Sequence, residues 1–328
     1  MTKYPLETIK APALLFLNGS CVLIKDSIKV TKTTTRSDIV LSNNVKAAER
    51  VDAQKIEIKG SPVAFSKLDV LFKELSLVKG SLLPRISNCY IAARVASGKW
   101  VKWSFLPAVH SGIGSISFGA NNPMGEHTWT IFPDPENPTK PLFESSEMTS
   151  APTVPSLTDA GKFMLRCLGV YGSGDDKIEF DTDGASIDIS LSTEDAQNDR
   201  LLKYGLLVSD IQVNVKLKPR GISYANWTKL SEISQTDELG SIQGVGTLPS
   251  LVLRGVKKGD FTFTAASARV KDPSATFSAK DPLMDELTFE ALGDYYGDNK
   301  LTIGTASADF EFETADTQSA GGQTKAVK

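Results

Sequence analysis

Along several stretches of this chain, apolar and polar residues alternate, as they do in a strand with one buried face. The alternation is clearest over residues 28–30, 56–58, 187–191, 213–217 and 310–312. Successive side chains of a strand point to opposite faces, so each stretch directs one set into a core and the other toward solvent or a partner. β-Branched and aromatic residues fill these stretches, which also favours strands. The chain is therefore predicted to be mainly β.

A helical period interrupts the strand pattern once in each half of the chain. After Ser66, four apolar residues recur at i, i+3, i+4 and i+7: Leu68, Leu71, Phe72 and Leu75. This spacing places them on one face of a short helix, with Ser66 as its capping residue. Ser223 precedes Trp227 and Leu230 in the same way farther along the chain. We therefore expect one short amphipathic helix in each half.

The two halves also resemble each other in sequence. Several blocks recur at an offset of about 157 to 160 residues: 27–30 with 186–189, 56–59 with 213–216, 65–71 with 224–230, 118–124 with 277–283, and 128–129 with 288–289. Self-similarity at a constant offset is the signature of repeated units. The pattern predicts an internal duplication, and the alternative is two unrelated β domains with similar strand spacing.

The duplication suggests where the chain divides. Prolines crowd one stretch between the halves: Pro133, Pro135, Pro138, Pro141, Pro152 and Pro155. Such a stretch continues neither a helix nor a central strand, so residues 133–155 are predicted to form a linker or a surface arm. We therefore expect a first module at residues 1–150, with an N-terminal arm, and a second module at residues 156–316. Residues 317–328 contain little apolar material and are predicted to be a flexible tail.

Composition narrows the classes of function. The formal net charge is −3, and 23% of the residues are charged, so the basic excess of a general nucleic-acid binder is missing. No stretch approaches the about 18 apolar residues of a membrane helix. The three cysteines have no CxxC spacing, which argues against a disulfide framework or a zinc knuckle. Cys21, Cys89 and Cys167 are expected to be free thiols that are buried or half-buried.

The sequence contains few candidates for catalytic or metal-binding residues. The only histidines, His110 and His127, have no nucleophile motif beside them and are expected on the surface or in loops. Residues 181–184 resemble a fragment of a calcium loop, but Ser192 stands where its glutamate belongs, so a turn is expected. Trp227, inside a glycosylation triplet, is expected to pack in the core. The chain is predicted not to be an enzyme, with no catalytic, cofactor-binding or metal-binding residue and no cofactor.

Taken together, the pattern resembles the major tail tube proteins of tailed bacteriophages. The resemblance is carried by a module of strands, one short helix and a long loop that occurs twice. The most similar segments are 281–289, with its counterpart 122–124, and 216–219 leading into the second helix. The resemblance covers most of the chain in outline. It implies two tandem β-sandwich or barrel-like modules, and it transfers an architecture and a role but no site residues.

That family implies a structural virion protein whose rings stack into a tube that conducts DNA during ejection. Single-module members form rings of six, so a duplicated chain is expected to form trimeric, pseudo-hexameric rings, with a hexamer as the alternative. The implied partners are other copies of the chain and the tape measure, tail terminator and baseplate or tip proteins. DNA would pass without specific binding, and no membrane is involved. Assembly would take place in the host cytoplasm, and the mature location would be the virion tail.

Two other classes remain open at this point. Another self-assembling or surface-binding β protein, such as a capsid decoration protein or a carbohydrate-binding adhesin, would share the strand pattern. An adhesin is expected to expose clustered aromatic residues on one face, whereas Trp100, Trp103, Trp129 and Trp227 fall on predicted strand and helix positions. An enzyme of an unrecognised type would need a convergent polar site, which the sequence does not reveal.

Overall fold

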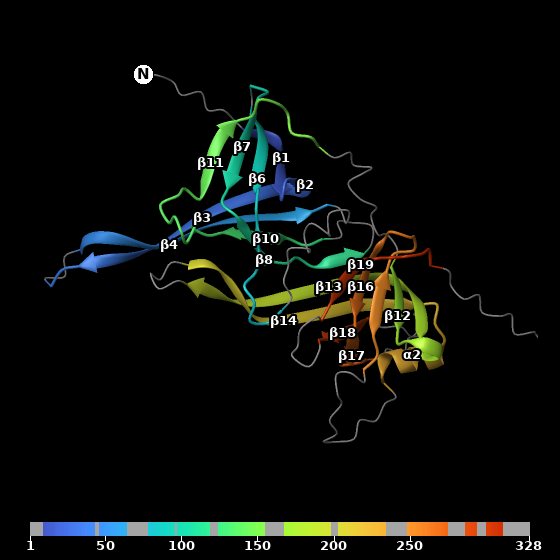
Figure 1. The fold of residues 1–328 in the computed structure, drawn as a ribbon. Helices are drawn as coiled ribbons and strands as arrows, with labels where there is room; N and C mark the ends of the chain where they lie inside the picture. The colour runs from blue at the N-terminus through green and yellow to red at the C-terminus, as the bar shows by residue number, and fades with distance from the viewer. Residues whose placement is uncertain are drawn as a thin grey trace, which may run out of the picture.

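The protein is mainly β, as predicted. The computed structural model describes residues 9–42, 46–63, 78–95, 97–118, 124–154, 167–197, 203–233, 248–274, 286–293 and 300–310. Within these ranges the chain forms three antiparallel sheets and one α-helix. Figure 1 shows the strands of the two halves beside each other along one elongated body.

The first half supplies two five-stranded sheets. One has the strand order β11-β7-β6-β1-β2, formed by β1 (Ile9–Leu17), β2 (Ser20–Val22), β6 (Tyr90–Val95), β7 (Trp100–Phe105) and β11 (Phe143–Glu147). The other has the order β3-β4-β10-β8-β5, formed by β3 (Ile24–Val40), β4 (Lys46–Pro62), β5 (Arg85–Ile86), β8 (Ala108–Gly112) and β10 (His127–Ile131).

The second half forms one larger sheet. Its order is β17-β18-β14-β13-β12-β15-β16-β19, with β12 (Leu168–Tyr171), β13 (Ile178–Gln197), β14 (Lys203–Arg220), β15 (Leu251–Arg254), β16 (Phe261–Ala265), β17 (Ser267–Lys271), β18 (Leu287–Leu292) and β19 (Thr302–Thr305). A ninth strand, β9 (Ile116–Phe118), comes from the first half and pairs with β13. A short 3-10 helix spans Gly174–Asp176.

The same strand order occurs in both halves. The runs β11-β7-β6-β1 and β8-β10-β4-β3 of the first half match β19-β16-β15-β12 and β17-β18-β14-β13 of the second half. The registers match as well. Trp129 lies opposite Ile58, as Phe289 lies opposite Val215. His110 lies opposite Trp129, as Val270 lies opposite Phe289. Hence the positions that the sequence pairs across the halves occupy equivalent places in the sheets.

The long hairpins β3–β4 and β13–β14 share their irregularities too. Their register shifts follow Thr35 and Ile39 in the first half and Ser192 and Ala196 in the second. Both pairs of positions differ by 157 residues. A third shift lies near the base of each hairpin, between residues 25 and 29 and between residues 182 and 185. A β-bulge bends and twists a strand at a defined place. Shared bulges therefore give the two hairpins the same path.

One block of the sequence comparison needs a correction. Val30 lies opposite Ile58, and Ile187 lies opposite Val215. Val30 is thus equivalent to Ile187 at an offset of 157, not to Ile189 at 159. The error is two residues, which is one full period of a strand, so each apolar side chain stayed on its correct face. The pattern alone could not detect this slip.

Alternation builds the core as expected. Along β14 every second residue is buried: Ile211, Val213, Val215 and Leu217. The main core cluster contains residues from both halves, including Ile58, Trp129, Ile187 and Phe289. Trp129, Trp227, Phe180, Phe263 and Phe289 are the largest of the fully buried side chains. The two halves thus share one continuous core.

The proline-rich stretch is more ordered than a linker. Residues 133–142 are turns and extended chain, but Phe143–Glu147 forms β11, which pairs with β7 at the edge of a sheet. β11 contains no proline, and as an edge strand it forms hydrogen bonds with only one neighbouring strand. A strand can therefore form within this proline-rich stretch. This part of the predicted linker or surface arm is thus an edge strand whose five residues are all exposed. The N-terminal residues 1–8 and the predicted tail 317–328 lie outside the described residues.

The second predicted helix is confirmed. It is α2 (Tyr224–Ser231), with Trp227 and Leu230 buried. Ser223 is the N-cap, and its hydroxyl oxygen accepts a hydrogen bond from the Asn226 amide at 3.2 Å. The equivalent helix predicted after Ser66 falls outside the part of the chain that the structure describes.

The cap gives a direct test of this local structure. We expect Ser223→Ala to lower the free energy of unfolding by about 1 kcal/mol, because an amide at the start of α2 loses its acceptor. Urea denaturation of the purified protein measures the change. Ser223→Asp keeps an acceptor oxygen and is the matched control. An equal loss in both variants would contradict a capping role.

Candidate assembly interface

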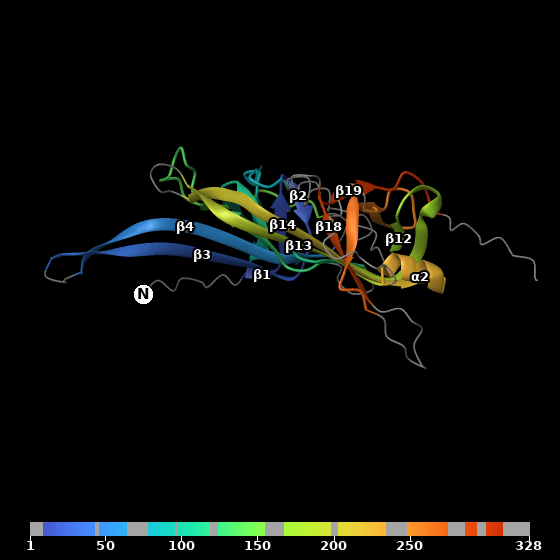
Figure 2. The ribbon, with the colours of Figure 1, turned by 90° about the horizontal axis from the view of Figure 1, so that it is seen from below.

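Two long antiparallel hairpins dominate the surface, and we call them the first ribbon (β3–β4) and the second ribbon (β13–β14). Both project toward the same side of the molecule, and the first ribbon extends beyond the rest of the described structure (Figures 1 and 2). A hollow lined by Thr33 and Lys55 of the first ribbon and Thr193 and Asp195 of the second lies between them. The ribbons are therefore neighbours in space.

One edge of the second ribbon is covered by a strand of the first half. β9 pairs antiparallel with β13, with Phe118 opposite Ala185 and Ile116 opposite Ile187. All four side chains are buried. Phe118 also packs edge-on against Phe263 of β16, with the ring centroids 5.7 Å apart. The first half thus adds a strand to the sheet of the second half and contributes an aromatic ring to its core.

The opposite edge of the second ribbon is covered by residues 80–83 of the first half. The Gly80 amide donates to the Val208 carbonyl at 2.7 Å, and the Val208 amide donates to the Ser81 carbonyl at 2.9 Å. The Leu83 amide donates to the carbonyl of Leu206 at 2.9 Å. These bonds satisfy the outer edge of β14 beyond the end of β18.

No described residue pairs with the equivalent edges of the first ribbon, and we call these edges bare. Among the described residues β3 pairs only with β4 along its length. Val51 is 48% exposed, whereas its equivalent Val208 is 1% exposed. Ile39 is 48% exposed, whereas its equivalent Ala196 is 3% exposed. The same fold therefore presents one covered and one uncovered ribbon.

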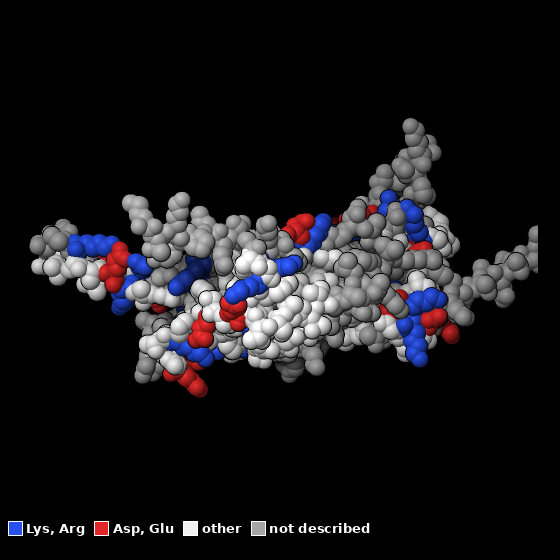
Figure 3. All heavy atoms as spheres, turned by 90° about the horizontal axis from the view of Figure 1, so that it is seen from above, with Lys and Arg blue, Asp and Glu red and all other residues white. Residues whose placement is uncertain are grey.

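Several charged side chains on the first ribbon form ion pairs. Ion pairs join Arg36 and Lys46 to Glu49, at 2.8 and 2.6 Å, and Arg50 to Asp52 at 2.7 Å. The Lys46 ammonium and the Arg36 guanidinium lower the pKa of the Glu49 carboxyl. Figure 3 shows basic and acidic side chains intermingled over the face that it draws. Exposed pairs of this kind contribute little to stability, but they leave no continuous basic stripe.

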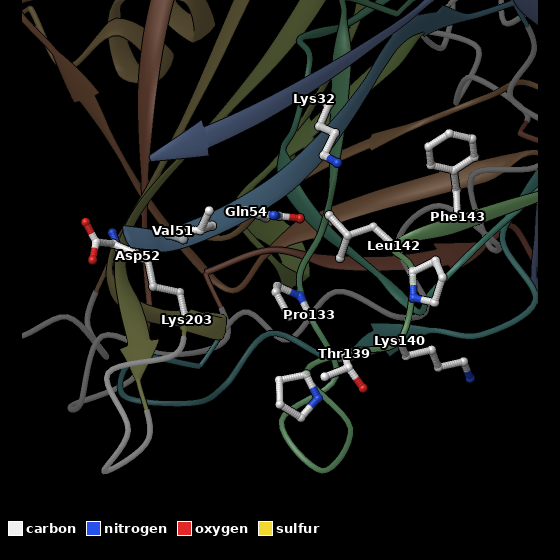
Figure 4. A pocket seen from close by; sticks show the side chains of 13 residues that line it. Lys32, Val51, Asp52, Gln54, Pro133, Thr139, Lys140, Leu142, Phe143 and Lys203 are labelled. Carbon is white, nitrogen blue, oxygen red and sulfur yellow. The ribbon is translucent and has the colours of Figure 1, made fainter. Parts of the chain in front are cut away.

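Two hollows border the ribbons. The first, of about 420 Å³, lies between β4 and the loop of residues 133–143, with Val51 and Gln54 on one side and Pro133 and Leu142 on the other (Figure 4). The second, of about 460 Å³, lies between the two ribbons. In the second hollow the carboxylates are tied to lysines, because Glu57 pairs with Lys55 and Asp195 pairs with Lys203.

Acid–base chemistry needs two titratable groups whose surroundings push their pKa values apart. The only carboxylate in the first hollow is Asp52, whose pKa is lowered by hydrogen bonds from Ser37 and Arg50. The carboxylates of the second hollow are already paired with lysines. Neither hollow, as the described residues line it, therefore offers the arrangement of an active site.

The histidines are not where the sequence analysis expected them. His110 on β8 and His127 on β10 are 2% and 0% exposed, and His110 Nε2 lies 2.9 Å from His127 Nδ1. Their rings stack near Trp129, at centroid distances of 5.5 and 5.9 Å. The prediction of surface or loop placement is wrong, because His127 shares a strand face with Trp129, two residues later. Alternation around Trp129 was the signal that could have revealed this.

Burial has a clear effect on one of these rings. Removal from water, and then the charge of His110, lower the pKa of His127 well below its ordinary value. His127 is therefore neutral in the folded protein over the physiological range. A neutral pair can share one hydrogen bond between a ring N–H and a ring nitrogen. The pair is best explained as a polar contact inside the sheet.

Residues 181–184 also differ from expectation. They lie within β13, at the register shift near its base, instead of in a turn between strands. The Thr182 amide donates to Asp181 Oδ1, and Gly184 has a φ of 90°. A glycine adopts this conformation easily. The Asp and Gly residues that indicated a turn in the sequence therefore belong to a β-bulge. Among the described residues no group of three or more His, Cys, Asp or Glu side chains could hold a metal ion.

Two other expectations are confirmed. Cys21, Cys89 and Cys167 are free and buried, and burial raises the pKa of the Cys89 and Cys167 thiols to about 12. Trp227 is 2% exposed and packs inside the protein. These residues stabilise the fold and offer no reactive group to solvent.

No protein-family model matches the chain, and no curated protein matches it. In the part of the chain that the structure describes, no helix has the length and apolar character required to cross a membrane.

The equivalent valines test the contrast between the ribbons. We expect Val208→Ala to lower the free energy of unfolding by about 2 kcal/mol, because it removes two buried methyl groups. Val51→Ala, at the exposed equivalent position, is expected to change it by less than about 0.5 kcal/mol. Denaturation of dilute, dispersed protein measures both. Equal losses would mean that Val51 is covered in the isolated chain.

The buried histidine predicts a dependence of stability on pH. The unfolded chain takes up a proton at His127 near pH 6.5, whereas the folded chain does not, because the folded pKa is lower. Stability is therefore fully present above about pH 6.5 and falls as the pH decreases, by at most about 1.4 kcal/mol per pH unit. Melting temperatures between pH 7.5 and 5.5 measure the slope. His127→Gln, which takes up no proton, is expected to flatten it, and an unchanged slope would contradict the assignment.

Proposed function

We propose that this protein is a structural subunit of a phage tail tube, built from two tandem copies of one tail-tube module, and that it assembles with copies of itself. It acts in this proposal through surfaces and not through catalysis. The absence of an acid–base arrangement in the two hollows is consistent with that role.

The duplication is supported by details that a shared fold class would not require. Strand order, cross-strand registers and two bulge positions recur between the halves. Strand alternation is common to all β domains, but bulges occur at specific positions and are retained within families. Two unrelated β domains have no reason to share them. The proposal is therefore that both halves are copies of the same kind of module.

The observation that carries the assembly proposal is the contrast between the ribbons. The first half covers part of each edge of the second ribbon, through β9 at residues 185–187 and through residues 80–83 at residues 206–208. No described residue covers the first ribbon in the same way. An exposed strand edge presents unpaired N–H and C=O groups and readily pairs with another chain. The contact between the halves is thus a template for a contact between molecules.

Such a contact is head-to-tail. The second half of one copy would meet the first ribbon of the next copy, as the first half meets the second ribbon within one chain. Head-to-tail contacts form a ring when the rotation closes. In the family that the sequence resembles, six modules complete a ring. Three double-module chains would supply six, so a trimer is proposed, with a hexamer as the alternative.

A tube of such rings suits the passage of DNA. DNA binds proteins largely through lysine and arginine contacts to its phosphates. The net charge of this chain is −3, and Arg36, Lys46 and Arg50 of the first ribbon are paired with carboxylates. A surface of this composition would hold DNA weakly and let it slide. The proposed location is the virion tail after assembly in the host cytoplasm, beside tape measure, tail terminator and baseplate or tip proteins.

The distribution of aromatic residues argues against an adhesin. Trp129 and Trp227 are buried, and Trp100 and Trp103 are half-buried. Among the described residues the large exposed apolar side chains include only two aromatic ones, Phe143 on β11 and Tyr224 on α2. These two lie in different halves of the chain. A glycan platform would bring several together on one face.

Assembly can be measured directly. We expect the purified protein to form trimers of about 106 kDa, three times the 35.3 kDa of one chain, as concentration rises. Sedimentation velocity measures the mass, and negative-stain microscopy is expected to reveal rings or tubes with a central channel. Val51→Asp is expected to weaken assembly, because it places a charge on the bare edge, while Tyr224→Asp on α2 serves as the surface control. Compact monomers at every concentration would overturn the proposal.

A further inference from the structure

The bare edge of β3 has a covered counterpart within the same chain. Residues 28–30 of β3 are equivalent to residues 185–187 of β13, because Val30 and Ile187 lie opposite the equivalent residues Ile58 and Val215. Ala185 and Ile187 are 7% and 0% exposed under β9. Ile28 and Val30 pack against the core but are only half-buried. The β3 edge has the form of an acceptor for one more short strand.

The sequence indicates which segment would fill that position. β9 follows β8 along the chain and precedes β10. The equivalent strands of the second half are β17 and β18, and the chain between their described parts runs from Ser274 to Glu286. Residues 275–277 of that segment correspond to β9, because Phe277 matches Phe118 and Pro282 matches Pro123. A donor segment with the sequence position of β9 is therefore present.

The acceptor edge and the strand that precedes the donor segment lie in two different sheets. One sheet passes from β3 through β4 and β10 to β8, and the chain then continues into β9, which pairs with β13 in the sheet that runs through β14 and β18 to β17. The first half meets the second at β13, and β17 is the far end of the second half. β17, after which the donor segment begins, is therefore separated from the β3 edge of its own chain by the other strands of both sheets. The partner that fits is a second copy.

We propose that residues 275–277 of one copy add as an antiparallel strand to residues 28–30 of β3 in the next copy. The register follows from the contact within the chain, where Phe118, Ser117 and Ile116 lie opposite Ala185, Ser186 and Ile187. It places Phe277 opposite Ile28, Thr276 opposite Lys29 and Ala275 opposite Val30. This inference rests on the proposed self-assembly and specifies the partner surface and its register.

A second pair of segments supports the same partner. Residues 80–82, Gly-Ser-Leu, bind the outer edge of β14 at Val208. Residues 240–242 read Gly-Ser-Ile at the equivalent place in the second half. The bare residue that matches Val208 is Val51 of β4. One neighbouring copy would thus offer a matching segment for each bare edge of the first ribbon.

Main-chain hydrogen bonds would hold such a junction, and side chains would fix its register. An added strand pairs its amides and carbonyls with those of the edge, while alternate side chains enter pockets of the acceptor. In the contact within the chain, Ile116 and Phe118 both enter the core, and Phe118 packs against Phe263. Phe277 has the same role in the proposed junction. The bare edge and the donor therefore match in both backbone and side-chain chemistry.

Paired cysteines test the register. Lys29→Cys and Thr276→Cys are introduced together, and mild oxidation is expected to give covalent dimers and trimers on a non-reducing gel. A mixture of the two single variants is expected to give dimers only, which identifies a bond between molecules. The shifted pair Thr31→Cys and Thr276→Cys is the register control and is expected to cross-link at least tenfold less. Wild-type protein, whose Cys21, Cys89 and Cys167 are buried, sets the background.

The equivalent contact within the chain, between β9 and β13, serves as the positive control for the cross-linking experiment. Ser117→Cys and Ser186→Cys lie opposite each other within one chain, so oxidation is expected to remove two thiols without changing the mass on the gel. If this pair oxidises while 29 and 276 do not, and rings still form, the proposed register is wrong and the self-assembly stands. A bond between 29 and 276 in monomers would also overturn the inference. Failure of the wild-type protein to assemble would overturn the proposed function itself.

Discussion

Every strand at the edge of a sheet has amide and carbonyl groups that need partners, and this requirement organises the whole molecule. The second ribbon meets it inside the chain, where β9 covers one edge and residues 80–83 cover the other. The first ribbon has the same path and the same bulges but no such cover among the described residues. Buried backbone groups are almost always paired, and exposed edges attract other strands. The asymmetry between the ribbons thus comes from the contacts that the first half makes with the second ribbon, not from a difference in strand order.

The asymmetry between the ribbons is visible in the exposure of individual side chains. Val208 and Val51 occupy the same place in their hairpins, yet one is buried and the other is half-exposed. Ala196 and Ile39 repeat the contrast near the tips. A monomer in water gains nothing from large apolar side chains at such exposed positions, and stable interfaces bury apolar residues at their centres. In the proposed assembly, the exposed side chains of the first ribbon form one half of an interface that a second copy would complete.

Local features of this fold were predictable from sequence, and non-local ones were not. Alternation over residues 213–217 and the cap at Ser223 each depend on neighbours within a few positions, and both are confirmed. Alternation cannot name a pairing partner, so the crossing of β9 to β13 was missed. Alternation also cannot detect a slip of two residues along a strand, which explains why Val30 was matched with Ile189 instead of Ile187. The buried pair of His110 and His127 was missed because polarity was given more weight than the apolar face they share.

Joining two modules in one chain changes how such a ring would form. The contact between the halves is intramolecular, and its effective concentration is set by the chain that connects them instead of by the amount of protein. That contact is therefore made as the chain folds, and it buries β9 at once. Only the contact at the first ribbon depends on the concentration of free molecules. A ring of three double modules forms in two encounters between molecules, whereas six single modules need five, because the last contact of a ring closes within the assembled complex. Duplication therefore reduces the number of concentration-dependent steps and leaves the first ribbon as the place at which assembly is controlled.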